Sequence, residues 1–337
     1  MSDVEPQYHP AGFDQELRAA LEEVRAGRWR AMGDLLATTD SWELRTARSQ
    51  VLAAAAAQGD AVEAWGREVL DHNWLMMWAR VLVQRAINAH RAKERHAAAL
   101  ADKARAACRA ATRYWPADPV PWVAQLALAQ VDDVQLHWRR PEHRLPSAEP
   151  LLPHGPWGLL AEVCQRHPDN REGWHRMLQA LTAYGEDVTD FGRWVASRAP
   201  QGSPLAVLPL YVYAQVCWRR QRAGAGTAMY WTTDPVSYYT SHARTWWFNH
   251  ADRATWSPLD LNYLAQAMHS GGFTEGTAPV FEAIGECATP LPWRYVAADP
   301  HRWQEEFLRA RRRHLRTPDP PDPPDPPRRP RQAAHRR

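Results

Sequence analysis

Apolar residues recur along the chain with the spacing of amphipathic helices. On the first such stretch the apolar face consists of Phe13, Leu17, Leu21 and Val24. Steps of three and four residues place these side chains on one face of an α-helix. No clear run of alternating β-branched residues and no Asn-Gly turn marks a strand or a hairpin. The pattern therefore predicts an all-α protein.

Several helix starts are marked by a capping residue followed by proline. These pairs are Asp118-Pro119, Ser203-Pro204, Asp234-Pro235, Ser257-Pro258 and Asp299-Pro300. The cap side chain accepts a free backbone N–H, and proline suits the first turn because the N–H that it lacks would have no partner there. Ser257 and Asp260 also have the spacing of a capping-box variant. Five such starts predict many helices of ordinary length.

The same helix junction occurs twice. Pro116 precedes Trp122 by six residues, Pro168 precedes Trp174 by six residues, and a polar turn lies between them in both cases. Proline ends one helix and the tryptophan enters the next. Turn glycines recur as well, at Gly27, Gly59, Gly185 and the pair Gly271-Gly272. Together these features predict helix pairs that stack in series.

This pattern resembles the tetratricopeptide repeat family, whose 34-residue unit combines a bulky residue, a glycine turn, small residues in its second helix and a closing proline. The small residues that match are Ala64, Ala104, Cys108 and Ala111. The resemblance implies an α-solenoid of degenerate helix–turn–helix (TPR-like) repeats. The sequence departs from the family because Pro116 and Pro168 are 52 residues apart and the leucine-glycine pair of the first helix is absent. The excess length falls in a proline-rich stretch at about 139–156, which we interpret as a loop insertion.

The resemblance also implies which positions line a groove. They are Val123 and Ala127 after Trp122, and His175 and Gln179 after Trp174. Only His175 and Gln179 are polar, so these two are the candidates for binding a protein or peptide partner. The charged clamp of some relatives is not matched, and a peptide bound by its terminal carboxylate is not expected.

We divide the chain into a flexible N-terminus at 1–12, a helical-repeat domain at 13–316 and a disordered tail at 317–337. Residues 317–331 hold eight prolines, which favour an extended polyproline-like chain. From Arg309 onward ten arginines and three aspartates give a net charge of +7. The net charge of the whole chain is +3, so residues 1–308 carry a net charge of −4. The basic tail makes a nucleic-acid partner an alternative, which the interleaved aspartates weaken.

The compartment is predicted to be the cytoplasm. The first residues do not form a signal peptide, and the longest apolar stretch, 205–218, is too short to span a bilayer. The four cysteines are far apart in sequence and form no redox motif, zinc motif or disulfide framework. We therefore expect them to be free thiols. Of 41 basic residues only Lys93 and Lys103 are lysines, a bias typical of a GC-rich genome such as an actinobacterial one.

The 18 tryptophans mostly fall at helical spacing among apolar residues, which favours packing roles. One dense cluster is an exception, and it comprises Tyr230, Trp231, Tyr238, Tyr239, Trp246, Trp247 and Phe248. We favour a thick helix junction for this cluster, but a partner surface remains open for Tyr238, Tyr239, Trp246 and Trp247.

The alternative to a binding protein is a helical enzyme with an aromatic-lined pocket around residues 230–256. The pair Asp132-Asp133 and the pair Arg294-Tyr295 resemble elements of the class I terpene cyclases, which are helical and rich in aromatic residues. The third acid of the DDxxD motif and the second magnesium motif are missing, so that chemistry is incomplete. The fifteen histidines form neither an HExxH motif nor zinc-finger spacing. We therefore expect a non-catalytic scaffold or adaptor without catalytic residues, cofactor or metal.

Overall fold

The computed structural model describes residues 5–133 and 140–315 of the chain. Within these residues every regular element is a helix and no strand occurs, so the predicted all-α class is confirmed. The tail predicted at 317–337 lies outside the described residues.

The chain forms a long succession of short and medium helices. The first half contains α1 (Gln15–Arg25), α2 (Arg30–Ala37), α3 (Trp42–Ala56), α4 (Ala61–Glu68), α5 (His72–Arg91), α6 (Ala97–Tyr114), α7 (Val120–Leu128) and α8 (Trp157–Arg166). The second half contains α9 (Arg171–Ala183), α10 (Thr189–Arg198), α11 (Leu208–Arg222), α12 (Asp234–His242), α13 (Pro258–Ser270), α14 (Thr277–Ile284), α15 (Pro290–Val296) and α16 (Trp303–Leu315). Two short elements matter below: the 3-10 turn η4 (Pro204–Val207) leads into α11, and the π-helical turn η6 (Ala243–Phe248) continues α12.

A helical turn begins at each of the five predicted proline starts. The predicted caps are confirmed at Ser203 and Asp299, whose side chains accept the N–H groups of Leu205 and His301. The cap predicted at Asp234 is wrong, because Thr233 is the N-cap of α12. Asp118 accepts the Val120 N–H at 2.8 Å, although Pro119 is the N-cap of α7.

The capping box predicted between Ser257 and Asp260 is wrong, because the Ser257 side chain makes no cap hydrogen bond. Asp260 pairs instead with Arg171 of α9. A charged guanidinium competes more strongly for that carboxylate than a neutral N–H does.

The helix junctions predicted from the proline–tryptophan spacing are confirmed. Helix α6 ends two residues before Pro116, and α8 ends two residues before Pro168. At the second junction the Trp174 indole donates to the Pro168 carbonyl at 3.0 Å. At the first junction Arg166 donates to the Pro116 carbonyl and covers the Trp122 ring. Each tryptophan is thereby fixed against the turn that precedes its helix.

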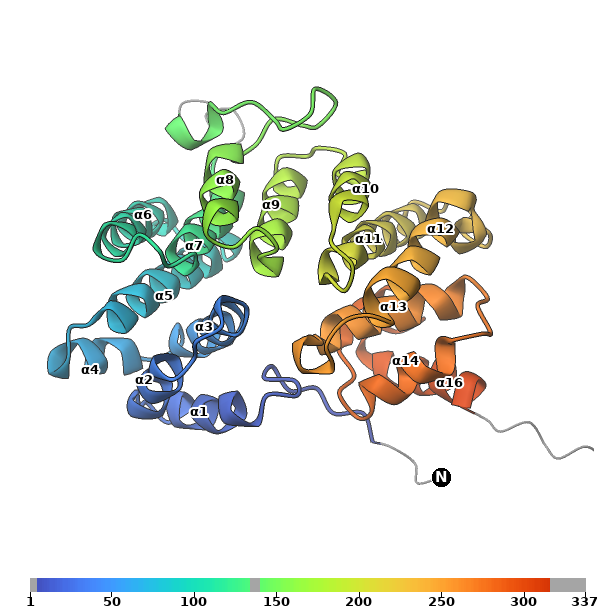
Figure 1. The fold of residues 1–337 in the computed structure, drawn as a ribbon, viewed down its shortest axis with the longest axis horizontal. Coiled ribbons are helices and arrows are strands. Elements are labelled where there is room, and N and C mark those ends of the chain that lie inside the picture. The colour runs from blue at the N-terminus through green and yellow to red at the C-terminus, as the bar shows by residue number, and fades with distance from the viewer. Residues whose placement is uncertain (1–4, 134–139, 316–337) are drawn as a thin grey trace, which may run out of the picture.

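The helices follow one another along a strongly curved row (Figure 1). Each odd-numbered helix from α1 to α7 contacts the next odd-numbered helix, and α11 and α13 do the same further on. The even-numbered helices pack against their sequence neighbours, most extensively in the α5–α6 pair. The loop predicted at about 139–156 holds one short 3-10 turn, Pro141–His143, in its described part.

The two ends of the curved row approach each other (Figure 1). The Gln7 N–H donates to the Glu286 carbonyl at 2.8 Å, and Ala11 is buried in the core of the first helices. Gly12 has a φ of +55°, and a Cβ there would lie 2.7 Å from the Pro258 ring. Residues 5–12, which the sequence placed outside the helical domain, thus connect α1 to the α13–α14 end.

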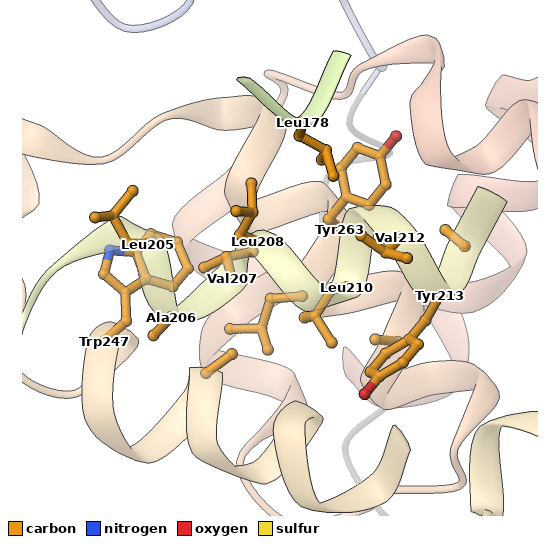
Figure 2. Packing of buried hydrophobic residues seen from close by; sticks show 14 of the residues in the cluster. Leu178, Leu205, Ala206, Val207, Leu208, Leu210, Val212, Tyr213, Trp247 and Tyr263 are labelled. Carbon is orange, nitrogen blue, oxygen red and sulfur yellow. The ribbon is translucent and has the colours of Figure 1, made fainter. Parts of the chain in front are cut away.

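Large aromatic side chains fill the core. Trp65, Trp247 and Trp293 are among the largest fully buried residues. Figure 2 shows Trp247 packed beside Leu205 and Ala206, where the π-helical turn meets η4. Tryptophan therefore serves packing at several junctions, as its helical spacing predicted.

Candidate functional site

Buried charges gather where the odd-numbered helices meet. Arg80 of α5 donates to both carboxylate oxygens of Glu172 on α9, at 2.7 and 2.6 Å. Both side chains are about 5% exposed or less. Arg176, one turn further along α9, donates to the same carboxylate at 2.8 and 2.9 Å. Burial opposes ionisation of Glu172, yet the two arginines outweigh it and hold the pKa of Glu172 below its ordinary value.

A second pair joins α3 to the start of α7. Arg45 donates to Asp118 at 3.2 Å, to the Asn73 amide oxygen at 2.6 Å and to the Leu36 carbonyl at 3.1 Å. Its guanidinium also lies over the Trp115 ring, 5.1 Å from the centroid. Each of the three guanidinium nitrogens donates a hydrogen bond. The buried Arg45 of α3 thereby connects α3 to α2, to α5 and to the turn before α7.

A third cluster joins α9, α11 and α13. Arg171 donates to both oxygens of Asp260 at 2.6 Å, and the Tyr211 hydroxyl donates to the same carboxylate at 2.5 Å. Asp260 is fully buried. Burial and the adjacent carboxylate raise the pKa of Tyr211 well above its ordinary value, so the hydroxyl stays protonated and remains a donor.

These three clusters join helices that are not neighbours among the odd-numbered helices. They connect α3 with α7, α5 with α9 and α9 with α13, each time across an intervening odd-numbered helix. Asn170 adds a further bond from the start of α9 to the Thr46 hydroxyl of α3 at 3.2 Å. Val123 is fully buried, so the expectation that it lines a groove is wrong. Ala127 is almost completely buried, but it borders a small cavity between α3, α5, α7 and α9. Helix α7 contacts both α5 and α9, which accounts for the burial of its side chains.

His175 and Gln179 lie one turn apart on α9 but have different neighbours. The His175 ring is half-buried and contacts the Tyr211 ring edge-on, with 4.5 Å between the centroids. Burial, followed by the charges of Arg171 and Arg176, lowers the pKa of His175 well below its ordinary value. Gln179 is exposed and accepts a hydrogen bond from Arg176 at 2.9 Å. Arg176 also borders a cavity of about 10 Å³ between α3, α5, α7 and α9, which has room for a single water.

The aromatic cluster of residues 230–248 divides into two parts. Trp231 and Trp247 are buried in the core, and Tyr239 is half-buried against Tyr213. Tyr238 is 62% exposed and Trp246 is 38% exposed. The junction that we favoured therefore accounts for the buried members, and an exposed surface remains at Tyr238 and Trp246.

The two exposed residues form an ordered row of three rings with the half-buried His242 between them. Tyr238 stacks on His242 at 6.0 Å with 3° between the planes, and His242 stacks on Trp246 at 5.7 Å with 20°. The Trp246 indole donates to the Ala199 carbonyl at 2.9 Å, which fixes the end of the row to α10. Within the π-helical turn Trp246 is exposed and its neighbour Trp247 is fully buried. Such turns occur frequently at functional sites. We call Tyr238, His242 and Trp246 the aromatic row.

Asp132, one of the residues that suggested enzyme chemistry, has structural partners. Asp132 is buried and pairs with Arg105, with Arg140 at 2.9 Å and with His143 at 3.3 Å. Across residues 5–133 and 140–315, no three histidine, cysteine or acidic side chains are grouped so that they could hold a metal ion. No helix in this same part of the chain is long and apolar enough to cross a membrane.

No family model, no curated protein and no solved structure matches this chain.

Proposed function

We propose that this protein is a non-catalytic adaptor built as an α-solenoid of degenerate TPR-like repeats, and that it binds a protein or peptide partner. The succession of contacts between odd-numbered helices supports the solenoid, since each helix pair meets mainly its neighbours in such folds. The four free cysteines support a cytoplasmic location, where thiols stay reduced.

The aromatic row is the observation that carries the proposal. Partner contacts in proteins are enriched in tyrosine and tryptophan, because both offer a large rigid area and a polar atom. Tyr238 and Trp246 present that area to solvent from a continuous helix whose far side is anchored in the core by Trp247. Gln179 is a second candidate contact because it is polar and exposed.

The test is an affinity capture from the native host with the full-length protein and with Tyr238→Ala. Loss of a stoichiometric partner from this variant is the expected result. The matched control is Tyr114→Ala, which removes a tyrosine of similar exposure, 65%, at the end of α6. Capture that is equal for wild type, Tyr238→Ala and a His175→Ala/Gln179→Ala double variant would refute both candidate surfaces.

A further inference from the structure

The small cavity between α3, α5, α7 and α9 is lined by four polar side chains. They are the guanidinium groups of Arg80 and Arg176 and the amides of Gln50 and Gln84, and alanine, valine and isoleucine side chains form the rest of the lining. Among the described residues, no acidic side chain lines this cavity. The charged part of the lining is therefore entirely cationic.

Arg80 keeps one hydrogen-bond donor that the described part of the chain does not use. Its two terminal nitrogens donate to Glu172, and one of them also donates to the Thr46 carbonyl. Its Nε–H has no hydrogen-bond partner among the described residues, although the side chain is only 4% exposed. A buried N–H of a charged group is costly to leave without an acceptor. Such a donor beside a cavity indicates an occupant that the chain itself does not supply.

The charge balance at the cavity favours an anion over a water molecule. Arg80 and Arg176 both pair with Glu172, which is the one acid that either of them contacts in the described part of the chain. Two positive charges therefore share one negative charge, and an excess charge in the interior is unfavourable unless it is neutralised. Water fills space but neutralises nothing. Arginine can only donate hydrogen bonds, which is what an anion requires of its ligands.

We propose that this cavity binds one monatomic anion of the halide type beside Arg80 and Arg176. Its volume of about 10 Å³ admits one species of about the size of a water molecule, so carboxylates and phosphates are too large. The Gln84 amide donates to the Asn88 side-chain oxygen at 2.8 Å and has a second N–H for the ion.

The ion would join two helices and remain in exchange with solvent. Gln50 and Gln84 are half-buried and the Arg176 side chain is 12% exposed, so an ion can reach the cavity beside them. Once bound, it would add a contact between Arg80 of α5 and Arg176 of α9 and stabilise the folded state by mass action. Anion binding here does not depend on the adaptor function proposed above.

The experiment measures thermal unfolding of the full-length protein by circular dichroism in sodium chloride, sodium bromide and sodium gluconate. Equal ionic strength keeps the screening of surface charges the same in all three salts. Gluconate is too large for a cavity of about 10 Å³, whereas chloride and bromide are single atoms. We expect the Tm in either halide to exceed the Tm in gluconate by at least about 2 °C once the halide is in large excess over its Kd.

Two buried alanines of α3 provide a matched pair of variants. Ala53 lines the cavity, whereas Ala56, about one turn further along α3, does not. Both are at most 3% exposed, so a change to valine crowds the core at either position. Ala53→Val fills the cavity and should abolish the difference between halide and gluconate, and Ala56→Val should retain it. Gln84→Leu should raise the Kd obtained from the concentration dependence of the Tm by about tenfold, because it removes a hydrogen bond to a charged group.

A Tm that is the same in all three salts would mean that the cavity holds water only, and it overturns the proposal. A halide effect that survives Ala53→Val places the ion elsewhere and overturns it as well. Anomalous diffraction from crystals soaked in bromide gives the position of the ion. Bromide within hydrogen-bonding reach of the Arg80 Nε supports the assignment, and bromide at surface positions alone, as an adventitious ion only, refutes it.

Discussion

Replacement of Glu172 by glutamine should destabilise the fold far more than a typical surface change. The substitution keeps the shape but removes the carboxylate between Arg80 and Arg176. Arg80 is 4% exposed, so its charge would remain in the interior without a counter-charge. Breaking a buried ion pair in this manner costs about 3–5 kcal/mol, most of it from the uncompensated partner. Arg176 adds less, because its side chain is 12% exposed and it retains the bond to Gln179.

A double-mutant cycle isolates the pair. Arg80→Met alone leaves Glu172 with Arg176 only, and we expect a loss of about 2–3 kcal/mol, the lower range for a partly compensated charge. The second single variant of the cycle is Glu172→Leu, which leaves the Arg80 charge uncompensated as Glu172→Gln does and should cost about 3–5 kcal/mol. The double variant Arg80→Met/Glu172→Leu removes both buried charges, and such replacements are often neutral. Its stability should fall within about 2 kcal/mol of wild type, whereas the two single losses sum to about 5–8 kcal/mol, so the coupling energy should be at least about 3 kcal/mol.

Urea unfolding followed by far-ultraviolet circular dichroism measures these differences. The pair Arg25–Glu22 in α1 is the control, because its side chains are 46% and 60% exposed at a similar distance of 2.7 Å. Glu22→Gln should change the free energy of unfolding by less than about 0.5 kcal/mol. If Glu172→Gln were as mild as Glu22→Gln, or if the double variant were as unstable as the sum of the single variants, the role given to the buried pair would be wrong.

Three further predictions concern other sites. His269 and His314 lie 3.0 Å apart, and burial followed by the charge of His314 lowers the pKa of His269 to about 4. Because the unfolded state takes up the proton first, the stability should be complete above about pH 6.5 and fall by about 1–2 kcal/mol toward pH 4, after allowance for partial exposure. His269→Gln should flatten this slope in urea titrations, and an unchanged slope would contradict the assignment. Trp247→Ala should cost about 3–5 kcal/mol in the same assay because Trp247 is fully buried, and a cost under 1 kcal/mol would show that the junction repacks. Burial raises the pKa of Cys108 to about 12, so iodoacetamide at pH 8 should label Cys108 only after unfolding, as peptide mass spectrometry can check.

The helices could be predicted from the sequence because their signals are local. Proline starts, the six-residue step from proline to tryptophan and the glycine turns depend on a few neighbouring residues, and the structure agrees with them at Pro116 and Pro168. The buried ion pairs were missed because their partners are far apart in sequence, as with Arg80 and Glu172, which are separated by 92 residues. One signal existed: Arg80 falls on the apolar face that Met76 and Val83 define, where an unpaired charge would be costly. A charged residue on a buried face indicates that it has a partner of opposite charge, but it does not identify that partner.

The split of the aromatic cluster follows helical spacing that its aromatic residues alone do not reveal. The buried residues Val236, Thr240, Ala243 and Trp247 recur at steps of four, three and four, whereas Tyr238 and Trp246 are eight residues apart on another face. Trp247 packs beside Leu205 of η4 (Figure 2). The small and polar members of the buried face, Thr240 and Ala243, hid this pattern when only aromatic residues were considered.

The buried charges and the exposed row have a common consequence for binding. Ion pairs between odd-numbered helices fix the curvature of the row of helices. A change of curvature would separate Arg171 from Asp260, or Arg80 from Glu172. Either separation would leave a charge without its partner, which costs free energy. A rigid frame loses little conformational entropy when a partner binds. Tyr238 and Trp246 are exposed on this frame, so a partner of the kind proposed above could contact them without any rearrangement of the buried pairs.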